Sequence, residues 1–77
     1  MTDYLGNGIG SFYVHRQVLA GSGETYNYFE YIHRAGKVII MRENATTNII
    51  DYADGGWNAD TAWAGRAGLD YKNISEL

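Results

Sequence analysis

Residues 25–52 read TYNYFEYIHRAGKVIIMRENATTNIIDY, and this stretch decides the fold. It is dense in aromatic and β-branched side chains, which favour pleated strands. Two short segments interrupt it, Arg34–Lys37 with a glycine near its end and the pair Asn44-Ala45. Both are typical of tight turns between antiparallel strands. The stretch therefore predicts a meander of three strands, over residues 25–33, 37–42 and 46–52.

The two turns also predict a pairing register, if each is a two-residue loop. A first turn at residues 35–36 and a second at residues 44–45 align isoleucines and a tyrosine across the three strands. Two ladders result, one on each face of the sheet: Tyr31–Ile40–Ile49 and Ile32–Ile39–Ile50. A register slip of one residue would exchange the two faces, because side chains alternate along a strand.

Both faces of this meander are then apolar, whereas a free antiparallel sheet normally keeps one face polar. The remaining residues, 1–20 and 53–77, are expected to cover one face well and two faces poorly. The pattern therefore predicts a protein partner. The alternative is that the two ends of the chain wrap both faces themselves.

The segments on either side of the meander add further elements. Residues 11–20 predict another strand, and residues 68–77 alternate well enough to predict a closing strand. Residues 59–66 predict a short helix, capped by Asn58 or Asp60. We expect a mainly β fold, namely a small antiparallel barrel or sandwich of four to five strands with one short helix or turn.

Residues 1–77 are expected to form a single β-rich domain, and residues 1–10 are expected to form a Gly-rich N-terminal arm. Gly6, Gly8 and Gly10 alternate in this arm. Glycine leaves the backbone free, so such an arm is either mobile alone or held by a partner. A phosphate-binding glycine loop would follow a strand and open a helix, whereas here a predicted strand follows.

Length, charge and composition narrow the functional classes. A chain of 77 residues builds a small core, and small domains usually need a disulfide, a metal or a partner. The chain has no cysteine and only two histidines, so association with other chains is the remaining means. A net charge of −3, with six scattered basic residues, does not indicate nucleic-acid binding. The N-terminus lacks a signal-peptide pattern and no apolar stretch reaches a membrane span, so we expect cytoplasmic synthesis and no membrane contact.

No set of residues predicts catalysis or a metal site. His15 and His33 have no third ligand or orienting carboxylate at an informative spacing. Glu30 lies in mid-strand among aromatic residues and is expected to pair with Arg42 across the hairpin. The serines lack a nucleophile motif. We therefore expect no enzymatic activity, no metal and no cofactor.

Aromatic and aliphatic side chains are the candidate binding residues, since tyrosine and tryptophan are favoured anchors of interfaces. Six residues are predicted to be core or interface anchors: Tyr28, Tyr31, Ile40, Ile49, Trp57 and Trp63. The aromatic strands run into basic residues, which keeps single-stranded nucleic-acid binding by a small β-barrel open as an alternative. A small inhibitor protein that caps one target is a further alternative.

The C-terminal stretch TAWAGRAGLDY, residues 61–71, precedes the ending Ser75-Glu76-Leu77. With these segments, its lack of cysteine and proline, and its many glycines and tyrosines, the chain resembles small tailed-phage virion structural proteins. The resemblance implies a capsid-decorating, head–tail or tail subunit that is repeated on a symmetric lattice. It implies binding to protein partners as a homo-oligomer or in a larger symmetric assembly, with incorporation into a virion.

Overall fold

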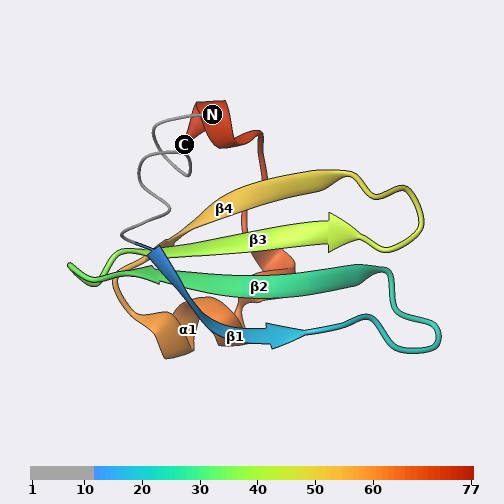
Figure 1. Ribbon diagram of the computed structural model, residues 1–77, viewed down its shortest axis with the longest axis horizontal. Coiled ribbons are helices and arrows are strands. Elements are labelled where there is room, and N and C mark those ends of the chain that lie inside the picture. Colours follow the sequence, from blue (N-terminus) through green and yellow to red (C-terminus); the bar gives the residue numbers. More distant parts are fainter. Residues whose placement is uncertain (1–11) are drawn as a thin grey trace.

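A computed structural model describes residues 12–77. Four strands form one antiparallel sheet in the order β1-β2-β3-β4 (Figure 1). The elements are β1 (Phe12–Val18), β2 (Tyr26–His33), β3 (Val38–Asn44), β4 (Ile50–Gly56), the helix α1 (Ala59–Ala64) and the 3-10 turns η3 (Arg66–Gly68) and η4 (Ile74–Glu76). The mainly β class is confirmed, and the sheet is open because β1 and β4 do not pair with each other. The predicted glycine arm lies outside the described residues.

The turn between β2 and β3 is one residue longer than the sequence predicted. The amide of His33 donates to the Lys37 carbonyl (2.8 Å), and the amide of Gly36 donates to the His33 carbonyl (2.7 Å). Gly36 has a φ of 104°, a left-handed conformation that glycine adopts without a penalty. Three-residue hairpin loops often end on such a residue. The added residue pairs Tyr31 with Ile39, so the predicted ladders were wrong and the two faces are exchanged.

The turn between β3 and β4 holds four residues instead of two. The amide of Asn44 donates to the Ile49 carbonyl (2.9 Å), which closes the loop over residues 45–48. The Asn44 side chain accepts from the amides of Thr46 (2.9 Å) and Thr47 (3.0 Å), a local bond that asparagine favours over continued strand pairing. The fourth strand is therefore displaced toward the C-terminus. Ile40 lies opposite Ala53, not Ile49, and Ile39 lies opposite Asp54, not Ile50.

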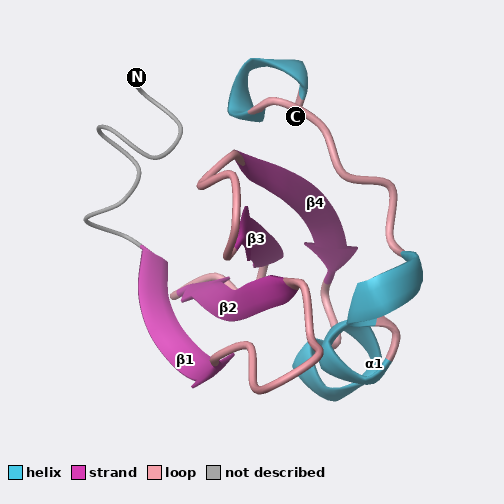
Figure 2. Cartoon of the chain, turned by 90° about the vertical axis from the view of Figure 1, so that its right-hand side faces the viewer, coloured by secondary structure: helices cyan, strands magenta, loops and turns pink. Residues whose placement is uncertain are grey.

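The core has two parts, one on each face of β3. Ile39 is fully buried with Phe12, and partly buried side chains that include Ile74 pack against them. Ile40 is fully buried on the other face, where Ala62 of α1 packs. Figure 2 shows α1 and the C-terminal 3-10 turn on opposite sides of the sheet. Segments of the chain itself thus cover both faces at the centre, and the prediction that they would cover two faces poorly was wrong.

The helix begins as predicted, and it packs where β4 approaches it closely. The Asn58 side chain accepts from the Thr61 amide (3.0 Å), which caps the first turn of α1. Gly55 lies at an irregularity of β4, and a Cβ at this position would meet Val38 Cγ1 at 2.8 Å and Ala62 Cβ at 3.1 Å. The glycine therefore permits the contact between sheet and helix.

The C-terminal segment crosses back to β4 without forming a full strand. Lys72 pairs with Tyr52 as an isolated antiparallel bridge, and the chain then enters η4. The predicted closing strand over residues 68–77 is thus reduced to one bridge. Within residues 12–77, no helix is long and apolar enough to span a membrane.

Candidate interaction surface

β1 is an edge strand, and it carries much of the exposed apolar surface. Within residues 12–77 it pairs with β2 alone, and it forms the lower edge of the sheet in Figure 1. Eight large apolar side chains are exposed in this part of the chain, and half of them lie on β1 or directly after it. These four are Tyr13, Val14, Val18 and Leu19. An unpaired edge with apolar side chains is a template for another chain.

The opposite edge, on β4, is partly closed by the chain itself. Tyr52 and Lys72 exchange two backbone hydrogen bonds, each of 2.8 Å. The backbone groups that the bridge uses are thereby satisfied, and the segment that contains Lys72 occupies the space beside β4. Ile49 and Ile50 remain exposed near the start of this strand.

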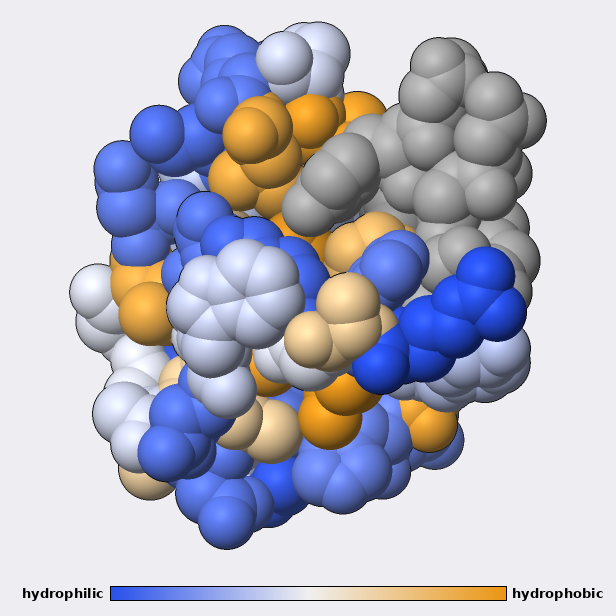
Figure 3. Space-filling model, turned by 90° about the vertical axis from the view of Figure 1, so that its left-hand side faces the viewer, coloured by the Kyte–Doolittle hydropathy of each residue, from blue (hydrophilic) through white to orange (hydrophobic). Residues whose placement is uncertain are grey.

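The end of the molecule at the left of Figure 1 shows a different pattern. In Figure 3, apolar residues at this end form several small patches that polar and charged residues separate. Trp57 is exposed and has the Lys37 ammonium 5.4 Å from its ring centre. Scattered patches of this size are ordinary on soluble proteins. The stronger candidate for a contact is β1, which lies at an edge of the sheet and pairs with β2 alone within residues 12–77.

A buried carboxylate holds β1 to the sheet. Glu30 is fully buried, and its Oε1 lies 2.7 Å from His15 Nδ1 and accepts from Arg16 Nε at 2.8 Å. The pairing register shifts between Val14 and Arg16, and this bulge lets two consecutive side chains reach one carboxylate. Its Oε2 is buried and has no hydrogen-bond partner among the described residues. The predicted pairing of Glu30 with Arg42 was wrong, because Arg42 binds Asp51.

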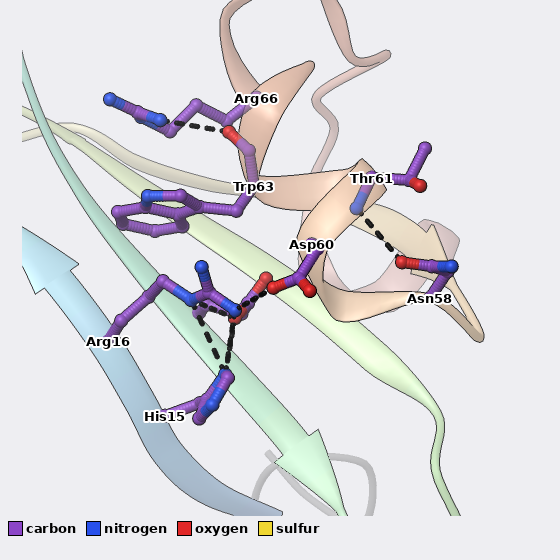
Figure 4. Close-up of polar contacts among 8 residues, drawn as sticks. His15, Arg16, Asn58, Asp60, Thr61, Trp63 and Arg66 are labelled. Carbon is purple, nitrogen blue, oxygen red and sulfur yellow. Dashed lines mark hydrogen bonds and ion pairs between the residues drawn. The ribbon is translucent and has the colours of Figure 1, made fainter.

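Arg16 also connects β1 to the helix (Figure 4). Its Nη2 donates to Asp60 Oδ1 at 2.7 Å. This hydrogen bond raises the pKa of Arg16 and lowers the pKa of Asp60. The ring of Trp63 lies between two guanidinium groups, 5.6 Å from Arg16 and 4.4 Å from Arg66. Edge strand, sheet and helix are therefore joined through one arginine.

A second arginine lies between two tyrosines. The Arg42 guanidinium is 4.3 Å from the ring centre of Tyr26 and 3.9 Å from that of Tyr71. Two hydrogen bonds to Asp51, of 3.0 and 2.7 Å, fix its orientation. Burial raises the pKa of the Tyr71 hydroxyl, which donates to the Arg66 carbonyl at 2.7 Å.

A half-open pocket of about 390 Å³ borders this stack. Its walls include Tyr26, Tyr28, Arg42 and Arg66, together with Val18 at the end of β1. Tyrosine and arginine are enriched at protein interfaces, so the pocket can receive a side chain of a partner. Four of the six basic side chains form ion pairs within residues 12–77, namely Arg16, Lys37, Arg42 and Lys72. Of the two cations that line the pocket, Arg42 is one of these four, so its attraction for a polyanion is reduced.

The two histidines lie apart and have different surroundings. His15 contacts Glu30, a carboxylate that its sequence spacing had not suggested. His33 Nδ1 accepts from the Ala35 amide at 3.0 Å and thus belongs to the turn. In the part of the chain that the structure describes, no three histidine, cysteine or acidic residues are placed to hold a metal ion.

The six predicted anchors fall into three groups. Ile40 is a core residue. Tyr28, Tyr31 and Trp63 are partly buried and pack against the two core clusters. Ile49 and Trp57 are 66% and 69% exposed, so they are not core anchors, and their role in an interface remains a prediction.

The sequence reasoning missed the apolar residues of β1 as a possible contact. Simple alternation along this strand predicts Val14 and Val18 on one face and Tyr13 on the other. The bulge at His15 instead places Val18 on the same face as Tyr13. The alternation of side chains and the position before the meander both predict a strand here. Neither feature indicates that the strand contains a bulge.

Comparisons with protein-family models, with curated proteins and with solved structures return no match. The chemistry of the chain's own residues is therefore the basis for any functional proposal. This chemistry consists of an open apolar edge, a buried carboxylate that anchors it and an arginine–tyrosine pocket at its end.

Proposed function

We propose that this protein is a non-catalytic structural subunit that associates with protein partners in a larger assembly. One observation carries the proposal, namely the concentration of exposed apolar side chains on the open edge β1. Tyr13 and Val14 are 57% and 55% exposed, and Leu19 directly after the strand is 60% exposed. Large apolar side chains on an unpaired edge promote aggregation of a monomer. In an assembly, the same side chains supply a contact surface for a partner.

The organisation of β1 supports this role. Glu30, Arg16 and Asp60 hold the strand to β2 and α1 from the inside, so its outer edge is presented in a fixed position. A fixed edge loses little conformational freedom on binding, which favours association. The resemblance to tailed-phage virion proteins suggests the kind of assembly, a capsid-decorating, head–tail or tail component made in a cytoplasm and incorporated into a virion.

The test is the mass of the purified chain in solution, measured by sedimentation across a concentration series from micromolar to millimolar. We expect a defined oligomer. The double variant Val14→Lys with Leu19→Lys is expected to sediment as a monomer, because two charges on the edge oppose strand pairing. The matched control is Ile49→Lys with Ile50→Lys near β4, which should associate like the wild type. A wild-type monomer at all concentrations would contradict the proposal.

Single-stranded nucleic-acid binding is the second candidate, because the pocket beside β1 combines two tyrosines with two arginines. Such proteins stack bases on aromatic rings and bind more weakly as salt increases. Fluorescence anisotropy with a labelled oligothymidine would distinguish the two functions. Salt-dependent binding that Arg66→Gln weakens would favour this candidate, and no binding at low salt would exclude it.

A further inference from the structure

We infer that the partner at β1 is a second copy of this chain, and that the two β1 strands pair antiparallel about a twofold axis between His15 and Arg16. The inference rests on the proposed function and specifies its contact. It follows from the bulge in β1, which determines which residues of the strand lie on which face of the sheet.

The pairing of β1 with β2 assigns these faces. Tyr13, Arg16 and Val18 lie opposite Ile32, Glu30 and Tyr28, and this is the face that α1 covers. Val14 and Gln17 lie opposite Tyr31 and Phe29, on the other face. Because of the bulge, Tyr13 and Val18 share a face although they are an odd number of residues apart.

Only some twofold axes bring like faces together, because directly opposite residues of antiparallel strands point to the same side of a sheet. An axis between His15 and Arg16 places Tyr13 against Val18 of the second copy, and Val14 against Gln17. An axis through His15 would oppose Tyr13 and Gln17, which lie on different faces. An axis through Arg16 would oppose Val14 and Val18, which also differ.

Two other axes also bring like faces together. An axis between Val14 and His15 would leave Val18 outside the paired region, although this side chain is exposed. An axis through Gln17, which opposes Arg16 and Val18, would leave the exposed Tyr13 and Val14 outside it. The axis between His15 and Arg16 pairs the strands over the full length of β1 and buries apolar side chains on both faces. It also brings Tyr13 of the second copy beside Val18, at a wall of the arginine–tyrosine pocket.

The charges near this axis are compatible with the pairing. The axis brings Arg16 of one copy next to His15 of the other. Each Arg16 already forms ion pairs with Glu30 and Asp60 of its own chain, at 2.8 and 2.7 Å. The two guanidinium groups therefore approach each other with their charges compensated, and the repulsion that normally protects an edge is reduced.

The other edge of the sheet limits the association to two copies by this route. The bridge between Tyr52 and Lys72 occupies the side of β4 where another strand would add. A twofold contact through β1 is closed, because each copy uses the same surface. The expected product is a dimer with a continuous eight-stranded sheet, since each copy contributes four strands.

The absence of cysteine permits a direct test by engineered cross-links. Single variants Tyr13→Cys and Val18→Cys are each purified, mixed with one another and oxidised under mild conditions. Directly opposite residues have Cα atoms about 4.5–5.5 Å apart, which suits a disulfide. We expect the mixture to cross-link at least about tenfold faster than either variant alone, because pairing raises the local concentration of the two thiols.

A second mixture provides an independent pair, and a third provides the matched control. Val14→Cys with Gln17→Cys should cross-link on the other face. Tyr13→Cys with Gln17→Cys should cross-link no faster than the single variants, since these residues lie on different faces. All four positions are exposed, and circular dichroism verifies that each variant retains the fold.

Each other outcome overturns the inference in a recognisable way. Fast cross-linking of a single variant with itself would indicate parallel pairing or another axis. Equal cross-linking in all mixtures would indicate random collision. A sedimenting oligomer without cross-links between positions 13 and 18 would overturn the β1 pairing and leave the proposed function intact, whereas a monomer would overturn both.

Discussion

The two edge strands of the sheet differ in what covers and fixes them. β4 is flanked by a later segment of the same chain, whose Lys72 pairs with Tyr52 through two backbone hydrogen bonds. β1 has no such neighbour among residues 12–77 and keeps exposed apolar side chains toward both of its ends. It is held from within, by the buried carboxylate of Glu30 and through Arg16 by Asp60 of α1.

This difference indicates which edge is available to a partner. The edge of β4 is covered by backbone pairing between Tyr52 and Lys72, and Gly55 allows α1 to pack closely against the sheet. Holding β1 requires a carboxylate out of water, which is costly unless its hydrogen bonds are satisfied. β1 is fixed by contacts with β2 and α1, and its outer edge is available to pair with a partner strand. β4 is flanked by the segment that contains Lys72 and therefore ends the sheet.

The largest expected effect comes from removing the anchor of β1. Glu30→Ala leaves a cavity in a fully buried position and deprives His15 and Arg16 of their acceptor. Large-to-small changes in buried positions cost about 2–5 kcal/mol, so we expect a loss of unfolding free energy in this range. Urea denaturation measures it. Glu30→Gln keeps the side-chain volume and one oxygen acceptor and should lose clearly less. If Glu30→Ala is as stable as the wild type, the carboxylate does not hold the edge.

The corresponding change at the other edge is Gly55→Ala. The added methyl group would lie 2.8 Å from Val38 Cγ1 and 3.1 Å from Ala62 Cβ, so β4 and α1 must separate. Overpacking of this kind costs about 1–3 kcal/mol. Thermal unfolding measures the loss, and Gly68→Ala is the matched control, because nothing lies within 4 Å of its added Cβ. Equal melting temperatures for the two variants would show that β4 tolerates a wider spacing.

The smallest effect is expected from alkaline pH, and it should act through three partly buried tyrosines, of which Tyr52 lies on β4. Burial raises the pKa of the hydroxyls of Tyr31, Tyr52 and Tyr71. A raised pKa in the folded state means that the neutral form is favoured there and that the unfolded chain ionises first. The stability is therefore complete below the ordinary tyrosine range near pH 10 and falls as the pH rises through it.

The urea midpoint, measured from neutral to alkaline pH, should thus fall above about pH 10. A matched variant isolates the contribution of one tyrosine. Tyr71→Phe loses the hydrogen bond to the Arg66 carbonyl and should be less stable at neutral pH. Its stability should also change less with alkaline pH than that of the wild type. An identical alkaline slope in both proteins would show that Tyr71 does not contribute.

Residues near one another in the sequence were predicted more accurately than residues that meet only in the folded chain. Four of the five predicted strand-forming runs, the cap at Asn58 and the short helix all depend on neighbouring residues, and they appear in the structure. The fifth run, over residues 68–77, forms only one bridge. The pairing of Glu30 depends on which strand lies beside it and on a bulge in that strand. No local pattern specifies either, and the expected partner Arg42 was therefore wrong.

The amino-acid sequence by itself determined that this protein is a mainly β chain with four strand-forming runs and glycine- or asparagine-containing turns. These features follow from local preferences of the backbone and side chains. The tertiary structure alone decided the register, the covered faces and the open edge. Loops of three and four residues replaced the expected two, and one added residue moves every side chain of a strand to the opposite face.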